Sequence, residues 1–321
     1  MKFLLAFVIF IVVGWSAGWF ALSAYLGGVA DDAISRLRAA GTDVTCGDRN
    51  TSGFPFSMQI SCDDISVASP DLIAPVTTGR LAAGVGLTAP QRLRLDLTSP
   101  LTFAGGEMQF EDAEAQIDLR TDGGFDRANF VIPTPRLTVG ALTAKAEQIS
   151  GEAQGGEPDL TVSINARDLQ TDLPQIGTVP SASVSLFATL AEGYRDLVQR
   201  GLSWQQVLSD GAQLNLRSLE LVTEGRGRLN IGGNLELRPD GLLNGPVRIA
   251  VSNPDALREW VRPLGLQSEQ MVATLTQAMN GMGVVRDIDG RQMQALDVMI
   301  DNGSLRFGFI KIGDIPPLRL N

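Results

Sequence analysis

The residues of this sequence that could carry out acid–base or metal chemistry are two short groups of carboxylates. Asp63 and Asp64 are adjacent, but neighbouring residues of a strand point to opposite faces of a sheet, so they would not act as a pair. Asp287 and Asp289 precede Gly290 as at the start of a calcium loop, but the further oxygen ligand and the later Glu are missing. We therefore expect a polar strand end at the first group and a hairpin turn at the second.

The other requirements of common active sites are missing from the sequence. It contains no histidine, which excludes Ser-His-Asp and Cys-His catalysis and zinc sites built on imidazole. The glycine-rich segments Gly225-Arg226-Gly227 and Gly232-Gly233 are not followed by Lys-Ser/Thr, so they do not form a phosphate-binding loop. We predict no catalytic residue, no metal site and no cofactor, and therefore a protein that is not an enzyme.

The only two cysteines, Cys46 and Cys62, lie 16 positions apart on either side of a Gly-Phe-Pro turn. Alternating apolar residues flank that turn, as in the two strands of a hairpin. In an exported protein this arrangement predicts a disulfide across the hairpin, and the alternative is a pair of buried free thiols.

The N-terminal segment Phe3 to Leu26 is a run of 24 residues without a charge. About 20 apolar residues suffice to cross a bilayer, so we predict a transmembrane signal-anchor over residues 1–30 and an exported β-rich domain over residues 31–321. The alternative is a signal peptide cleaved after Ala30, although its apolar region would be unusually long. Both readings export the body, and the first places it in the periplasm on a single-pass inner-membrane anchor.

The charge of the chain limits its partners. The net charge is −10, and because Lys2 is the only charged residue among the first 30, the remainder carries −11. An acidic body repels phosphate backbones, so we expect no nucleic-acid partner. The partners that we expect are the lipid bilayer, through residues 3–26, and a lipid ligand or an envelope protein.

From Val44 onward the apolar residues alternate with polar ones, which predicts antiparallel sheets with one apolar and one solvated face. Hairpin signals separate the alternating segments: Asp122-Gly123, Asp240-Gly241, Asn244-Gly245 and Asn302-Gly303. We predict an α+β fold, mainly antiparallel β, in which the body is a large curved or sandwich-like sheet.

A few covering helices interrupt this alternation. We expect helices over residues 31–40, 185–200, 203–208, 254–261 and 268–282. Asn253 followed by Pro254 is a strong helix start, and Met271, Leu275, Met279 and Met282 fall on one face of the last helix.

Two segments carry a resemblance to known proteins. Together with the long N-terminal span, SGFPFSMQISCD (52–63) and GSLRFGFIKIGDIPPL (303–318) resemble a bacterial family of unknown function, domain family 2125. Its members look like envelope proteins, and the resemblance implies no activity. The strand and turn order of residues 214–251 is also similar to AsmA-type envelope proteins, which implies a curved β groove that handles lipid.

Three functions remain open at the level of sequence. The first is an uncharacterised membrane-anchored envelope protein that binds lipid or another hydrophobic ligand in an apolar β groove. The second is a structural or assembly factor of the envelope that binds a protein partner, with its one-faced strands packed into a closed sandwich. An envelope hydrolase that uses carboxylates alone is the third.

Overall fold

The computed structural model describes residues 41–69, 74–174, 177–288 and 290–317, together with seven positions nearer the N-terminus. These are Ser16, Trp19, Gly28, Ile34, Ser35, Arg38 and Ala39. The chain divides into two compact units, Met1–Leu119 with Leu137–Gly140, and Arg120–Arg136 with Ala141–Asn321. We describe each unit by itself.

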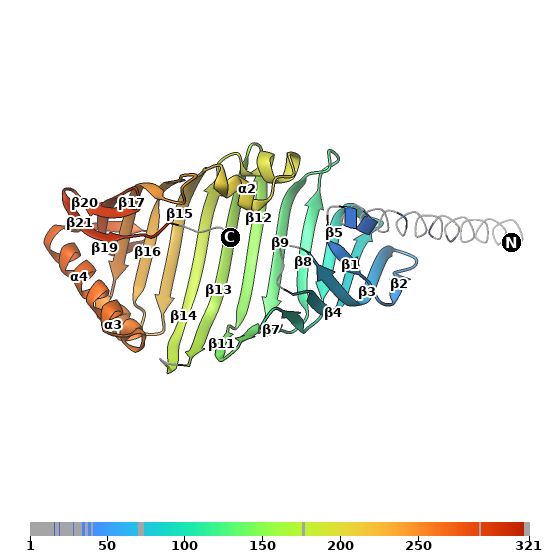
Figure 1. The fold of residues 1–321 in the computed structure, drawn as a ribbon, viewed down its shortest axis with the longest axis horizontal. Coiled ribbons are helices and arrows are strands. Elements are labelled where there is room, and N and C mark those ends of the chain that lie inside the picture. The colour runs from blue at the N-terminus through green and yellow to red at the C-terminus, as the bar shows by residue number, and fades with distance from the viewer. Residues whose placement is uncertain are drawn as a thin grey trace, which may run out of the picture. The chain divides into compact units, whose positions relative to one another are not determined.

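The first unit is an antiparallel sheet (Figure 1). Its strands are β1 (Asp43–Thr45), β2 (Arg49–Ser52), β3 (Ser57–Ala68), β4 (Val76–Gly86), β5 (Ala89–Leu97), β6 (Leu101–Phe103), β7 (Gly106–Gln109), β8 (Ala113–Leu119) and most of β10 (Arg136–Val139). Strands β3, β4, β5 and β8 lie side by side in this order, and both β1 and β2 pair with β3. The turn Gly53–Phe56 joins β2 to β3, as the sequence predicts. Its first residue has a φ of 102°, which glycine adopts readily and residues with a side chain disfavour.

The second unit contains the longer strands. They are β9 (Phe125–Pro133), β11 (Leu142–Lys145), β12 (Gln148–Gly156), β13 (Asp159–Leu173), β14 (Gly177–Leu190), β15 (Ala212–Thr223), β16 (Arg228–Leu237), β17 (Leu243–Ser252), β18 (Val284–Ile288), β19 (Arg291–Asp301), β20 (Ser304–Phe307) and β21 (Ile310–Asp314). Their antiparallel order is β9, β12, β13, β14, β15, β16, β17, β19, β20 and β21, with β11 beside β13 and β18 beside β19. The described strands of this unit therefore form one sheet and not two facing sheets.

Five short or medium helices accompany the second sheet. They are the π-helix η1 (Arg195–Gln199), α2 (Trp204–Ser209), α3 (Pro254–Val261), the 3-10 helix η2 (Arg262–Leu264) and α4 (Leu266–Met282). Helix α2 begins at a capping box in which Ser203 and Gln206 satisfy each other's backbone N–H groups. Helix α3 begins at Pro254 as predicted, although the side chain of Asn253 donates to the carbonyl of Gly225 rather than capping the helix. The predictions over 203–208, 254–261 and 268–282 are confirmed to within two residues.

The helix predicted over residues 185–200 is wrong for its first half. Strand β14 continues to Leu190, and only Arg195–Gln199 form a π-helix after a turn. The segment is flanked by β13 and β15, so its backbone groups are satisfied by sheet pairing on both sides. Val184, Leu186 and Ala188 alternate with polar or aromatic neighbours, which is the period of a strand.

Three of the four predicted hairpin signals lie in turns between strands, namely Asp122-Gly123, Asp240-Gly241 and Asn302-Gly303. Asn244-Gly245 is the exception, because both residues belong to β17. Gly245 is needed there for a different reason: a side chain would run into the backbone carbonyl of Asn234 on β16.

The main core of the second unit lies between α3, α4 and one face of the sheet. Leu257 of α3 and Met279 of α4 are both buried, and they pack on Leu296 and Val298 of β19. Partly buried residues of β15, β16 and β17 extend the cluster, as does Phe307 of β20. The antiparallel β fold with a few helices is thus confirmed.

The predicted membrane anchor lies almost entirely outside the described residues. Of residues 3–26, only Ser16 and Trp19 are described, and both are helical. None of the helices in the described ranges is long and apolar enough to cross a membrane. Of the helix predicted over 31–40, the described residues Ile34, Ser35, Arg38 and Ala39 are helical.

Candidate functional site

The most distinctive feature of the second unit is a continuous apolar face on its sheet. Because side chains alternate between faces, the strand register decides which apolar residues become neighbours. One row across the sheet is Phe130, Gly151, Ile164, Leu186, Leu219, Ile231, Ile249 and Leu296. The adjacent rows are Ala153, Val162, Ala188, Leu216, Gly233, Val247 and Val298 on one side, and Ile132, Ile149, Ala166, Val184, Leu221, Leu229 and Val251 on the other.

The opposite face of the same strands is polar. One of its rows is Asn165, Ser185, Glu220 and Asn230. A depression of about 480 Å³ is lined by polar side chains, among them the hydrogen-bonded pair Asn215 and Asn234, and also by the apolar residues Leu216, Pro246, Val247 and Ile288. Within it Arg248 forms an ion pair with Asp297 at 2.7 Å, and the guanidinium of Arg217 lies 4.9 Å from the centre of the Phe187 ring. We conclude that the two faces have different roles and that the apolar face is the unusual one.

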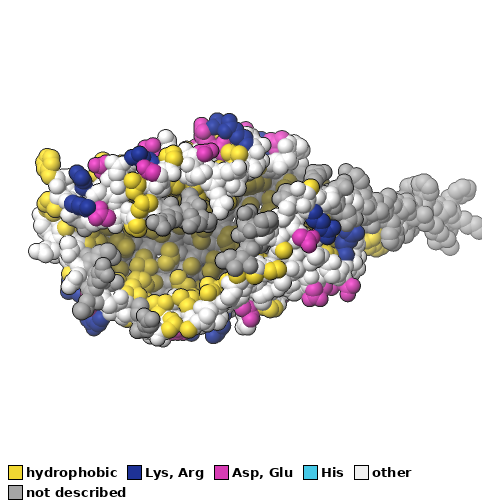
Figure 2. All heavy atoms as spheres, viewed as in Figure 1, with side chains coloured by type: hydrophobic (Ala, Val, Ile, Leu, Met, Phe, Trp, Pro, Cys, Tyr) yellow, Lys and Arg dark blue, Asp and Glu magenta, His cyan; other side chains and the backbone are white. Residues whose placement is uncertain are grey.

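The apolar face is covered unevenly. Towards β17 and β19 the helices α3 and α4 bury it, and Leu296 is 1% exposed. Towards β12, β13 and β14 most side chains of these rows are only half-buried, and Ile164 at the middle of β13 is 38% exposed, although Ala188 of β14 is buried. Figure 2 shows hydrophobic side chains gathered in a hollow over these strands of the second unit. We call the rows on β9 and β12–β15 the apolar floor.

Aliphatic side chains make up nearly all of the apolar floor. The one aromatic residue in its three rows is Phe130, whose ring lies over Gly151 of the neighbouring strand. A methyl group at Gly151 would collide with that ring and would lie 3.1 Å from the carbonyl of Ser163. The glycine therefore lets the ring lie close against the sheet.

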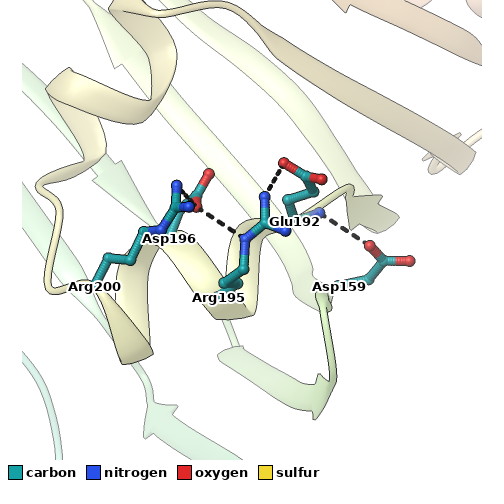
Figure 3. A network of polar contacts seen from close by, with 5 residues as sticks. All are labelled: Asp159, Glu192, Arg195, Asp196 and Arg200. Carbon is teal, nitrogen blue, oxygen red and sulfur yellow. Dashed lines mark hydrogen bonds and ion pairs between the residues drawn. The ribbon is translucent and has the colours of Figure 1, made fainter.

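Charged residues gather at one end of the inner strands of the sheet, where β13 begins and β14 ends. Asp159 accepts the backbone N–H of Glu192 at 2.9 Å. Arg195 forms ion pairs with Glu192 and Asp196, and Arg200 reaches the same Asp196 carboxylate at 3.1 Å (Figure 3). The contact with Asp159 ties the start of this segment to β13, and the ion pairs of Arg195 and Arg200 stabilise η1 itself.

A second charged group lies in or next to the turns between β8 and β9 and between β12 and β13. Arg120 lies within 3.1 Å of Asp122 and 3.4 Å of Glu157, and Asp126 is 3.9 Å away. These carboxylates, Asp122 above all, raise the pKa of the Arg120 guanidinium, so it stays charged at any physiological pH. We define the charged rim by these residues: Arg120, Asp122, Asp126, Glu157, Asp159, Glu192, Arg195, Asp196 and Arg200.

Tyr194 connects the charged rim to the sheet. It is 1% exposed, and its hydroxyl oxygen accepts the backbone N–H of Phe125 at 3.0 Å. Its ring lies 5.5 Å from the ring of Phe125 and against Gly155 of β12, which has no side chain to displace it. The tyrosine thus fixes η1 to the start of β9 and the end of β12.

The carboxylates considered from sequence are not among the residues of the apolar face. Asp63 forms an ion pair with Arg80 at 3.6 Å, whereas Asp64 is exposed and has a φ of 52°. Asp287 accepts the N–H of Gly290 at 2.8 Å, so the predicted hairpin turn between β18 and β19 is confirmed, while Asp289 lies outside the described residues. Within the described ranges, no group of three or more Cys, Asp and Glu residues is placed to hold a metal ion.

The two cysteines are brought together as predicted. The sulfur atoms of Cys46 and Cys62 lie 2.16 Å apart, at disulfide distance, and their Cα atoms are 5.4 Å apart. Cys62 is on β3, and Cys46 is in the connection between β1 and β2 rather than on a strand. Both β1 and β2 pair with β3, so the pair ties this connection to the sheet of the first unit.

Sequence reasoning missed the charged rim and the packing of Tyr194. The charged residues of the rim come from three separate turns, so only the pairing of the strands shows that they are neighbours. The mistaken helix over 185–200 also hid the end of β14, although the alternation of Val184, Leu186 and Ala188 was a usable signal.

Comparison with known proteins gives one match. Residues 19–316 match the model of a protein family described as "Uncharacterized protein conserved in bacteria (DUF2125)". No curated protein and no solved structure matches the chain. The likeness to AsmA-type proteins therefore stays a prediction.

Proposed function

This chain belongs to the DUF2125 family of uncharacterised bacterial proteins, whose description names no activity. We propose that the sheet of the second unit binds the acyl chains of a lipid on its apolar floor. The observation that carries the proposal is the half-buried state of aliphatic residues on the part of the face that α3 and α4 leave open, with Ile164 38% exposed. Transfer of an apolar ligand onto such a surface is favourable by roughly 25 cal/mol per Å² removed from water.

The size and chemistry of the floor suit an acyl chain. The floor crosses five strands, β9 and β12–β15, and a spacing of about 4.8 Å between strands makes it about 19 Å wide. The acyl chains of one leaflet extend about 15 Å, which is half of the hydrocarbon core of a bilayer. Flexible aliphatic side chains can pack along such a chain, whereas a site for a planar ligand would be expected to hold more aromatic rings.

The charged rim indicates which headgroup would be tolerated. It combines six carboxylates with three guanidinium groups, so its net charge is −3. A headgroup that carries an ammonium group would be attracted to this edge, and a purely anionic one would be repelled. We therefore propose zwitterionic phospholipid as the preferred ligand.

We also propose that residues 3–26 anchor the chain in the inner membrane with the body in the periplasm. The support is the length of the uncharged run, 24 residues, and the basic residue Lys2 that precedes it. An anchored body would be held beside a supply of lipid.

The test is native mass spectrometry of the full chain, with a matched pair of variants on β13. Ile164→Asp places a charge in the middle of the floor, and Ser163→Asp places the same charge one residue away on the polar face. We expect bound phospholipid on the wild-type protein and on Ser163→Asp, and an occupancy that is lower by roughly tenfold on Ile164→Asp, equivalent to about 1.4 kcal/mol.

The same experiment can refute the proposal. Equal occupancy in the two variants would show that lipid binds elsewhere, and a wild-type protein without lipid would exclude the floor as a lipid site. A stoichiometric protein partner that co-purifies with lipid-free chain would instead favour the assembly factor.

A further inference from the structure

The turn between β2 and β3 in the first unit exposes two large aromatic side chains. Phe54 is 50% exposed and Phe56 is 74% exposed, and only Pro55 separates them. The sequence around them carries no charge from Asn50 to Cys62, in a chain whose overall charge is −10. Neighbouring exposed aromatics in an uncharged segment mark a surface that contacts something apolar.

The contacts of this turn point to what it meets. Trp19 is helical and 8% exposed, and its ring lies edge-on to Phe54 with the centroids 5.5 Å apart. The indole Nε1–H of Trp19 also donates to the backbone carbonyl of Ser57 at 3.0 Å. The turn is therefore held against residue 19, which lies inside the uncharged run from Phe3 to Leu26.

The position of Trp19 in that run sets the expected depth. Trp19 is the 17th residue of that run, about 24 Å from Phe3 along an α-helix. Because about 20 residues suffice to cross a bilayer, a span that begins at Phe3 ends near Leu22. Trp19 then lies within about one helical turn of the level where the headgroups meet the acyl chains, at which tryptophan side chains are commonly found. A turn that packs on Trp19 reaches the same level.

We propose that Phe54 and Phe56 insert into the leaflet of a phospholipid bilayer beside the N-terminal span. This inference rests on the proposed anchor but not on lipid binding to the apolar floor. Insertion removes two phenyl rings from water, and the contacts of Trp19 with the Phe54 ring and the Ser57 carbonyl hold the turn in place, which lowers the entropy cost of insertion. The turn would thus be a second point of attachment, in addition to the anchor, that fixes how the first unit sits on the membrane surface.

The test is photo-crosslinking of the full chain in phosphatidylcholine bilayers that contain a radiolabelled lipid. The photoreactive amino acid p-benzoylphenylalanine replaces Phe56 in one sample and Phe309 in a matched control. Phe309 is also an exposed phenylalanine in a turn, between β20 and β21, and it is fully solvent-accessible. Neither side chain is buried in the protein, so both replacements are expected to fold.

We expect at least tenfold more labelled lipid on the protein with the probe at position 56 than on the control. Equal yields at the two positions, with the chain still resistant to extraction by alkaline carbonate, would overturn this inference and leave the anchor standing. Release of the wild-type chain by carbonate would overturn both. Neither result depends on whether lipid occupies the apolar floor, which the variants at Ile164 and Ser163 test separately.

Discussion

Replacing Gly155 with alanine would test the packing that holds the charged rim on the sheet. A methyl group at this position of β12 would lie 2.6 Å from the carbonyl oxygen of Phe125 and closer still to the ring of Tyr194. The carbonyl belongs to the backbone of a paired strand, so it cannot move freely. The ring is 1% exposed and is held by the hydrogen bond from the N–H of Phe125, so it has no empty space to enter.

The cost of the substitution follows from these two constraints. Overpacking of a filled interior costs about 1–3 kcal/mol. Displacement of Tyr194 would also leave the N–H of Phe125 without its partner, which costs about 1–3 kcal/mol for a buried group. We expect Gly155→Ala to lower the free energy of unfolding of the second unit by about 2–6 kcal/mol.

The neighbouring glycine provides the control. A methyl group at Gly156 would have no atom within 4 Å, so Gly156→Ala should change the stability by no more than about 0.5 kcal/mol. In urea unfolding of the full chain, with a slope of about 2 kcal/mol per molar, Gly155→Ala should shift the midpoint down by about 1–3 M. Equal midpoints for the two variants would refute the reasoning.

A double-mutant cycle would show whether the ring is responsible. In a Tyr194→Leu background the atoms of the ring that meet the new methyl group are gone, and only the carbonyl of Phe125 remains close. The penalty of Gly155→Ala should therefore fall by about 1 kcal/mol in that background. An unchanged penalty would assign the whole effect to the backbone contact.

Two further predictions concern the disulfide pair and a carboxylate at the end of the sheet. Replacing Cys62 with alanine opens a loop of 16 residues and should lower the free energy of unfolding of the first unit by about 3 kcal/mol. Equal urea midpoints of the variant and the wild type under oxidising conditions would contradict this. The ammonium of Lys311 donates to Asp314 at 2.7 Å and lowers the pKa of that carboxyl. The pair therefore stabilises the folded protein at pH values above the pKa that Asp314 has in the unfolded chain. This contribution is lost as the pH falls through the pKa that Asp314 has in the folded protein. In Lys311→Met the pKa of Asp314 should rise towards its ordinary value of about 3.9, as measured by carboxyl NMR, and a pKa that does not move would contradict the assignment.

Features of the fold that depend on neighbours in sequence were predictable. The alternation of apolar residues identified the sheets, the Asp-Gly and Asn-Gly pairs located three hairpins, and Pro254 located the start of α3. The pairing of Cys46 with Cys62 followed from their spacing around one turn. Each of these signals is short-range, because a turn or a helix start is specified by the residues within it.

The candidate site itself was not predictable, because it depends on contacts between distant segments. Alternation alone shows that Ile164 has an apolar neighbour on the next strand, but only the register identifies that neighbour as Leu186. Whether a floor is left open or closed is decided by where α3 and α4 pack, and these helices cover the strands near β17 and β19 only.

Other features of this protein divide in the same way into properties of the sequence and contacts that only the tertiary structure creates. The residues of the apolar rows, the acidic charge and the uncharged N-terminal run are properties of the chain, and from them an envelope location and a hydrophobic surface are predicted. The contact of Trp19 with the turn at Phe54 joins residues 35 positions apart, and the charged rim joins three turns. Tertiary packing decides such neighbours, because sheet pairing and side-chain burial bring together residues from distant segments. No pattern within any one of these segments predicts the contact.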